Sequence, residues 1–128
     1  DKETVVQLIH QTDTDRPKML QDFGNIFFFQ HITQAFSEWF FQLGLQAAGW
    51  ATAAIANMWI REVLFSDLET ITVPTLIIHD QVVPFQLGEI QSKSIKSSRL
   101  VPFYYSGHAA FYDEKDRFNE ELVKFVEV

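Results

Sequence analysis

Two short apolar runs, separated by one helical stretch, shape the second half of the chain. Residues 73–79 are rich in β-branched side chains, and residues 99–105 form a second strand-like run. Between them, residues 85–97 mix apolar and polar side chains as an amphipathic helix does. This order, with short connections, predicts two parallel strands. Parallel sheets are buried on both faces and seldom have only two strands, so we expect the sheet to continue outside this chain.

A last helix is predicted to follow the second strand. Asp113 is expected to be its N-cap, with Asp116 close to the positive end of the helix dipole. Apolar residues at helical spacing form the side expected to face inward: Phe118, Leu122, Phe125 and Val126. The charged side chains of the same helix are expected to face solvent: Glu120, Glu121 and Lys124.

The first half of the chain, residues 1–66, is predicted to be helical throughout. Pro17 marks one helix start, because a proline in the first helical turn loses no hydrogen bond. Residues 32–43 place large apolar side chains on one helical face, and Gly44 is expected to end or bend that helix. A further helix over residues 50–65 is apolar nearly all round, so we expect it to be covered on most sides.

Charge and composition exclude several classes of function. The chain has 10 Lys and Arg against 17 Asp and Glu, a net charge of −7, with no basic cluster. Nucleic acid is therefore not expected as a partner. The absence of cysteine removes disulfides, thiolate metal sites and a cysteine nucleophile. His10 and His31 have no partner at ligand spacing, so no metal site is expected.

Residues 39–60 carry no charged side chain and are long enough to span a bilayer. They contain polar amides among much Ala and Gly, which makes them too weakly apolar for lipid, so we expect a buried helical pair. The sequence begins at Asp1 without the features of a signal peptide. We expect a cytoplasmic protein with no membrane partner, while a signal outside this sequence and a homo-oligomeric state stay open.

Two residues that can carry chemistry lie just after the carboxyl ends of the two predicted strands. Asp80 directly follows the first predicted strand, and His108 follows the second within Ser106-Gly107-His108. In open parallel sheets, ligands and reacting groups gather at the carboxyl ends of the strands. A carboxylate that accepts the Nδ1–H of an imidazole fixes its tautomer and stabilises its charged form. The histidine can then act as a general base towards a hydroxyl group.

The strand at residues 73–79, the following Asp80-Gln81-Val82-Val83-Pro84 and the Gly107-His108 pair resemble the last third of α/β-hydrolases. The closest likeness is to the bacterial cofactor-free haloperoxidase-like esterases and arylesterases. The resemblance implies an α/β fold, with residues 67–128 as the C-terminal part of the parallel sheet (two strands with helices). Residues 1–66 would be the all-helical cap that precedes it. It also implies a triad in the chain order Ser, Asp, His, with Asp80 as the acid and His108 as the base.

The sequence departs from the family pattern in two ways. The family usually has His-Gly-x-x-Asp, whereas His79 here runs straight into Asp80. Either about three residues are deleted, which would move Asp80 back towards the strand, or the sequence joins residues across an omitted loop. We favour the second explanation. The second departure is that no Gly-x-Ser-x-Gly occurs. The nucleophile is therefore expected in an N-terminal half of the same protein, and the chain alone is expected to be inactive.

The resemblance also suggests residues that would touch a substrate. Val82 and Val83 match family positions that line the acyl pocket, although ordinary core packing is the alternative for both. Phe28, in an aromatic run, and Trp59 are candidates for the wall of the substrate cavity, with helix packing as the alternative. No metal and no organic cofactor is expected.

These observations predict a serine hydrolase that cleaves small carboxylic esters through an acyl-enzyme. Another α/β-hydrolase reaction, such as C–C bond hydrolysis or dehalogenation, is the nearest alternative. A non-catalytic interaction module on a degenerate hydrolase fold is a second alternative, favoured by the short step before Asp80. A membrane-associated helical protein is a third.

Overall fold

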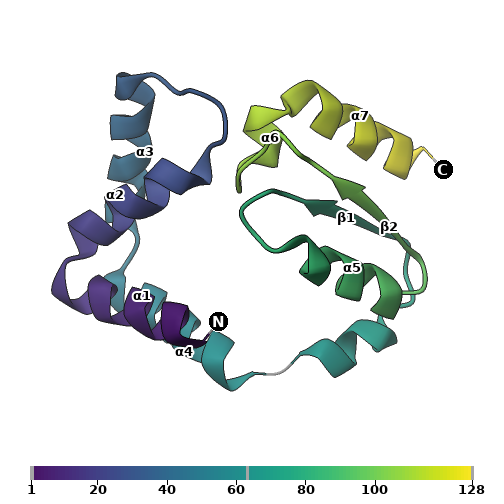
Figure 1. Ribbon diagram of the computed structural model, residues 1–128, viewed down its shortest axis with the longest axis horizontal. Helices are drawn as coiled ribbons and strands as arrows, with labels where there is room; N and C mark the ends of the chain where they lie inside the picture. Colours follow the sequence, from purple (N-terminus) through teal and green to yellow (C-terminus); the bar gives the residue numbers. More distant parts are fainter. Residues whose placement is uncertain (1, 63, 128) are drawn as a thin grey trace. The chain divides into compact units, whose positions relative to one another are not determined.

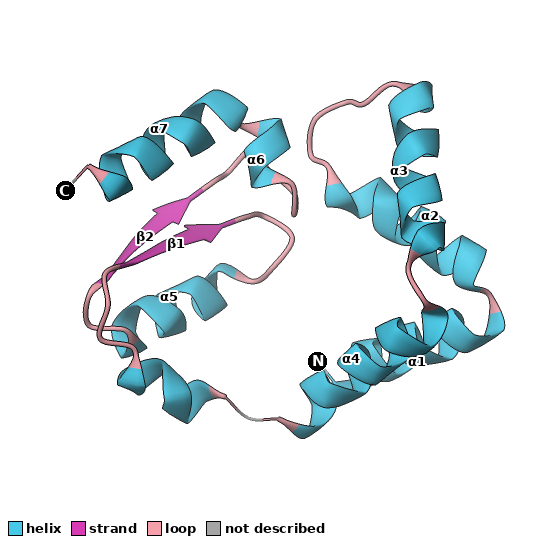
Figure 2. Cartoon of the chain, turned by 180° about the vertical axis from the view of Figure 1, so that it is seen from behind, coloured by secondary structure: helices cyan, strands magenta, loops and turns pink. Residues whose placement is uncertain are grey.

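A computed structural model describes residues 2–62 and 64–127. The chain divides into two compact units, the first made of Asp1–Asn25 and Ile32–Val63 and the second of Ile26–His31 and Leu64–Val128. The first unit contains helices and no strand among its described residues, whereas the second contains a small sheet with helices (Figures 1 and 2). No described helix is both long and apolar enough to cross a membrane.

The first unit is built from four helices, as predicted for this half of the chain. They are α1 (Lys2–Thr14), α2 (Arg16–Phe27, whose last residues belong to the second unit), α3 (Gln34–Gln46) and α4 (Gly49–Arg61). Helix α1 packs along α4. The carboxylate of Asp15 accepts the backbone N–H of Lys18 at 3.1 Å, so Asp15 acts as a cap just before Pro17.

Two predictions for this unit are wrong in detail. Helix α3 does not end at Gly44, which instead permits close packing, because a Cβ there would lie 3.0 Å from the Leu20 side chain. Helix α4 is not covered on most sides: Ala56 is buried, but Trp50 is 80% exposed and Trp59 is more than half exposed. The apolar character of α4 is therefore not explained by contacts within the described chain.

The second unit contains the predicted alternation of strands and helices. In chain order these are a 3₁₀ helix (Phe65–Thr70), β1 (Thr75–His79), α5 (Phe85–Ser94), β2 (Ser98–Pro102), α6 (Ala110–Asp113) and α7 (Lys115–Val126). Strands β1 and β2 pair in parallel, with Thr75 opposite Ser98 and His79 opposite Pro102. This confirms the two parallel strands expected from the sequence.

Helices lie on both faces of the two strands, α5 on one and α7 on the other (Figure 1). On the α7 side, Phe118 packs against a cluster formed by Val101, Phe103 and Ala110. On the α5 side, Gly88 lies so close to His79 that an added Cβ would be 2.9 Å from the ring nitrogen Nδ1. Packing on both faces thus fixes the positions of the carboxyl ends of the two strands.

The end of the chain differs from the prediction. Asp113 is the last residue of α6 and not the N-cap of α7, whose N-cap residue, Glu114, makes no capping hydrogen bond to the helix with its side chain. Phe118 faces the core as expected, but Val126 is 73% exposed and Leu122 is also exposed. The two described strands cover only the first part of α7's apolar stripe.

Candidate active site

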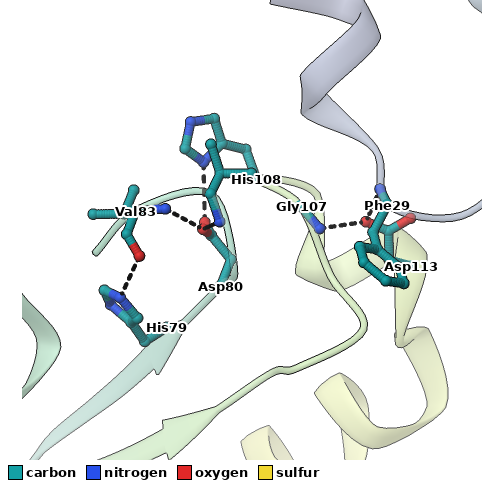
Figure 3. A network of polar contacts seen from close by, with 8 residues as sticks. Phe29, His79, Asp80, Val83, Gly107, His108 and Asp113 are labelled. Carbon is teal, nitrogen blue, oxygen red and sulfur yellow. Dashed lines mark hydrogen bonds and ion pairs between the residues drawn. The ribbon is translucent and has the colours of Figure 1, made fainter. Parts of the chain in front are cut away.

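The parallel pairing brings the two predicted site residues together. Asp80 is the first residue after β1, and His108 lies in the loop between β2 and α6. The Nδ1 atom of His108 is 3.0 Å from Oδ2 of Asp80 (Figure 3). The side chains are partly shielded, with exposed fractions of 17% for Asp80 and 30% for His108. The pair is therefore partly accessible to solvent.

The loop after β1 folds around the Asp80 carboxylate. Its Oδ1 accepts the backbone N–H groups of Val82, at 2.8 Å, and Val83, at 3.1 Å. The buried His79 ring closes this turn, with Nε2 lying 3.1 Å from the carbonyl oxygen of Val83. Because a carbonyl only accepts, Nε2 of His79 carries the proton. These contacts fix the direction in which the Asp80 carboxylate points (Figure 3).

The two loops are also joined through their backbones. The N–H of Gln81 donates to the carbonyl oxygen of Ser106 at 3.1 Å, and the N–H of Phe103 donates to the backbone carbonyl oxygen of His79 at 2.7 Å. The Ser106 side chain is fully buried. The spacing between Asp80 and His108 is thus set by backbone hydrogen bonds as well as by the side-chain contact.

The charge state of Asp80 follows from its surroundings. Burial raises the pKa of this carboxyl, but the hydrogen bonds from His108, Val83 and Val82 and the charge of His108 outweigh it. The pKa of Asp80 therefore lies below its ordinary value, and Asp80 is ionised at neutral pH. An ionised carboxylate can only accept, so Nδ1 of His108 is the donor. In a neutral His108 the lone pair then lies on Nε2, which is the form of a general base.

The direct step from His79 to Asp80 does not keep Asp80 away from His108. No residue separates the last residue of β1 from Asp80, yet the carboxylate still reaches His108. The family's longer His-Gly-x-x-Asp spacing is therefore not needed for this contact, which removes the main sequence argument for a degenerate site.

The other predicted site residues lie in different places. Val83 lines a cavity of about 320 Å³ beside Asp80, whereas Val82 is 39% exposed. Phe28 lies in the second unit, with its ring 5.3 Å from that of Tyr112. Trp59 belongs to the first unit. Contact of any of these residues with a substrate stays a prediction.

Sequence reasoning missed two neighbouring acids that hold the His108 loop. Glu114 accepts from the backbone N–H of Tyr105 at 3.0 Å and from the Ser106 hydroxyl at 2.8 Å, and it pairs with Arg117. Burial raises the pKa of Glu114, but these partners lower it by more. Asp113 binds the N–H of Gly107 at 2.9 Å. The available signal was the pair of consecutive acids soon after Gly107-His108, of which Asp113 was predicted to be a helix N-cap and Glu114 was given no role.

Within the part of the chain that the structure describes, no three His, Cys, Asp or Glu side chains are grouped as metal ligands would be. The arrangement offers a hydrogen-bonded carboxylate and imidazole instead. Such a pair can take a proton from a hydroxyl and later return it.

No family model matches the chain. It is 37% identical over 127 residues to the AB hydrolase superfamily protein YisY of Bacillus subtilis (strain 168), covering 97% of this chain and 47% of that protein. An esterase (EaEST) from Exiguobacterium antarcticum is 40% identical, with a TM-score of 0.92 over 100% of this chain and 49% of the esterase. A bromoperoxidase from Bacillus anthracis, at 23% identity, shares the fold, with a TM-score of 0.89 over 98% and 49%. The chain thus spans about half the length of these relatives.

Proposed function

The chain belongs with the α/β-hydrolases by sequence and by fold, and on this basis we propose that it supplies the acid and the base of a serine hydrolase. Asp80 is the acid and His108 the base of a Ser-Asp-His triad. The serine comes from a part of the protein outside this chain. The observation that carries the proposal is the 3.0 Å contact between Nδ1 of His108 and the ionised Asp80, at the ends of adjacent parallel strands.

The proposed reaction proceeds through an acyl-enzyme. Nε2 of His108 takes the proton of the serine hydroxyl while the serine oxygen attacks the carbonyl carbon of the ester. His108 then returns that proton to the leaving alcohol as the ester C–O bond breaks. In the second half, His108 takes a proton from water, which attacks the acyl-enzyme, and the proton returns to the serine as the acid leaves. Asp80 stabilises the imidazolium form in both halves and holds its orientation.

The proposed substrate is a small carboxylic ester with an apolar acyl or alcohol group. The 40% identity to a protein described as an esterase supports ester chemistry. The apolar character of the substrate is proposed from the aromatic side chains of the helical half of the chain, such as Trp59. No metal and no organic cofactor enters this mechanism. The partners we propose are the substrate and the half of the same protein that carries the serine.

The test is ester hydrolysis by the intact protein that contains this chain, with p-nitrophenyl acetate and butyrate. His108→Ala and Asp80→Asn are each expected to lower kcat about 10⁴-fold, since each removes a triad member. His10→Ala, an exposed histidine on α1, is the matched control and should retain the wild-type rate. Wild-type rates from both site variants would exclude the proposal. If the wild-type enzyme did not cleave esters but did cleave a C–C or C–halogen bond, the proposed ester substrate would be wrong and one of the alternative α/β-hydrolase reactions would replace it.

A further inference from the structure

The loop that carries His108 is tied to a segment far away in the sequence. One carboxylate, that of Asp113, accepts three backbone N–H groups, from Phe29, Gln30 and Gly107, each at 2.9 Å. Figure 3 shows the bonds from Phe29 and Gly107. Phe29 and Gln30 precede Asp113 by 84 and 83 positions. All four residues belong to the second unit. These three hydrogen bonds to one carboxylate join the His108 loop to residues 29 and 30.

The backbone on both sides of His108 lies against Phe27. The N–H of Ala109 donates to the carbonyl oxygen of Phe27 at 3.2 Å. On the other side, a Cβ added to Gly107 would lie 2.5 Å from the same oxygen. The residues immediately before and after His108 therefore both touch one peptide group, and glycine is what allows this approach.

The same segment also contacts the imidazole itself. The Phe27 ring stands edge-on to the His108 ring, with 5.9 Å between the ring centroids. Asp80 thus holds the imidazole through Nδ1, and Phe27 packs against the ring. Phe29 and Gln30, whose N–H groups Asp113 binds, follow Phe27 two and three positions later and hold the backbone just beyond it.

From these contacts we infer that Asp113 is a positioning residue for the general base. It locks the His108 loop and the Phe27–Gln30 segment together, so that Nε2 is held where the serine hydroxyl must meet it. The inference rests on the proposed function, because it assigns Asp113 a role in that reaction. Asp113 touches no reacting atom and acts only through its contacts with Gly107, Phe29 and Gln30. Misplacement of a reacting group by about 1 Å can cost a factor of about 100 in rate.

The test compares Asp113→Ala, Asp113→Asn and Phe118→Leu in the intact protein, with kcat, KM and the unfolding midpoint measured for each. Asp113→Ala removes all three acceptor contacts and is expected to lower kcat about 10- to 100-fold. Asn keeps one carbonyl oxygen, which can still accept from Phe29 and Gly107, so Asp113→Asn should lie between Ala and wild type. Phe118→Leu loosens the core cluster that includes Ala110 of α6 but removes none of the Asp113 hydrogen bonds, so it should keep kcat within about twofold of wild type.

The outcomes separate this inference from the proposed function. If His108→Ala is inactive while both Asp113 variants keep the wild-type kcat, the positioning role is wrong and the triad stands. If His108→Ala is fully active, the proposed function itself fails. If Asp113 had only a structural role, the fall in kcat in Asp113→Ala and in Phe118→Leu would follow the fall in the unfolding midpoint of each variant. That result would overturn the inference. Should Asp113→Ala not fold, Asp113→Asn decides, since a wild-type kcat for it would equally overturn the inference.

Discussion

The carboxylate of Asp80 makes three contacts with neighbouring nitrogen atoms. Its Oδ1 binds two backbone N–H groups and its Oδ2 binds the imidazole of His108. This division leaves one oxygen for orientation and one for stabilising positive charge on the ring. A turn aspartate alone would show only the first kind of contact. The second kind is what favours a triad acid over an ordinary turn residue.

The lowered pKa of Asp80 makes a prediction about stability and pH. A carboxyl whose pKa is lower in the folded than in the unfolded state stabilises the fold when ionised. That contribution is complete above the unfolded pKa, about 3.9, and is lost as the pH falls through the folded value. The difference in unfolding free energy between wild type and Asp80→Asn should therefore shrink between pH 5 and pH 3.

Urea denaturation at a series of pH values measures this difference. Glu114, whose pKa is also lowered, titrates in both proteins and so cancels in the comparison. A difference that stays constant across the range, or grows on acidification, would show that Asp80 is not held ionised by its neighbours.

Among the elements, the loop between β2 and α6 depends on one glycine. A Cβ at Gly107 would lie 2.5 Å from the carbonyl oxygen of Phe27 and 2.9 Å from the carbonyl carbon. Both are backbone atoms, so they cannot relieve the clash by rotating as a side chain can. Gly107→Ala is expected to destabilise the protein by about 1–3 kcal/mol and to displace His108, lowering ester turnover. Thermal unfolding and kcat report the two effects.

Gly24→Ala is the matched control for that substitution. Its added Cβ would meet only a Phe40 ring carbon at 3.8 Å, an ordinary contact. Gly24 lies inside helix α2, where alanine is favoured by about 0.5–1 kcal/mol. Equal losses of activity in the two variants would show that the approach of Gly107 to Phe27 is unimportant.

The elements that the sequence predicted well are those with a local signature. Strand β1 and helix α5 follow from hydrophobic pattern, and the parallel pairing follows from their order. The break between α6 and α7 was not predicted, nor were the hydrogen bonds of Asp113. Its partners Phe29 and Gln30 lie more than 80 positions away, and such contacts leave no periodic signal nearby.

At the scale of the whole molecule, apolar side chains remain on the surface of the described chain. Trp39, Phe65 and Tyr105 are each more than half exposed, and the sheet has two strands. Parallel sheets of this size are seldom stable alone. The relatives are about twice as long, which is consistent with further structure covering these surfaces and supplying the nucleophile we propose.

The most direct test of the central claim is the rate at which a fluorophosphonate labels the intact protein. These reagents react with a serine whose hydroxyl is activated by a neighbouring base. A single serine outside this chain should be labelled in the wild type and in His10→Ala. His108→Ala should slow the labelling at least about 10³-fold. Labelling that proceeds equally fast without the His108 imidazole, or that finds no serine in the wild type, would contradict the claim that Asp80 and His108 activate a nucleophile.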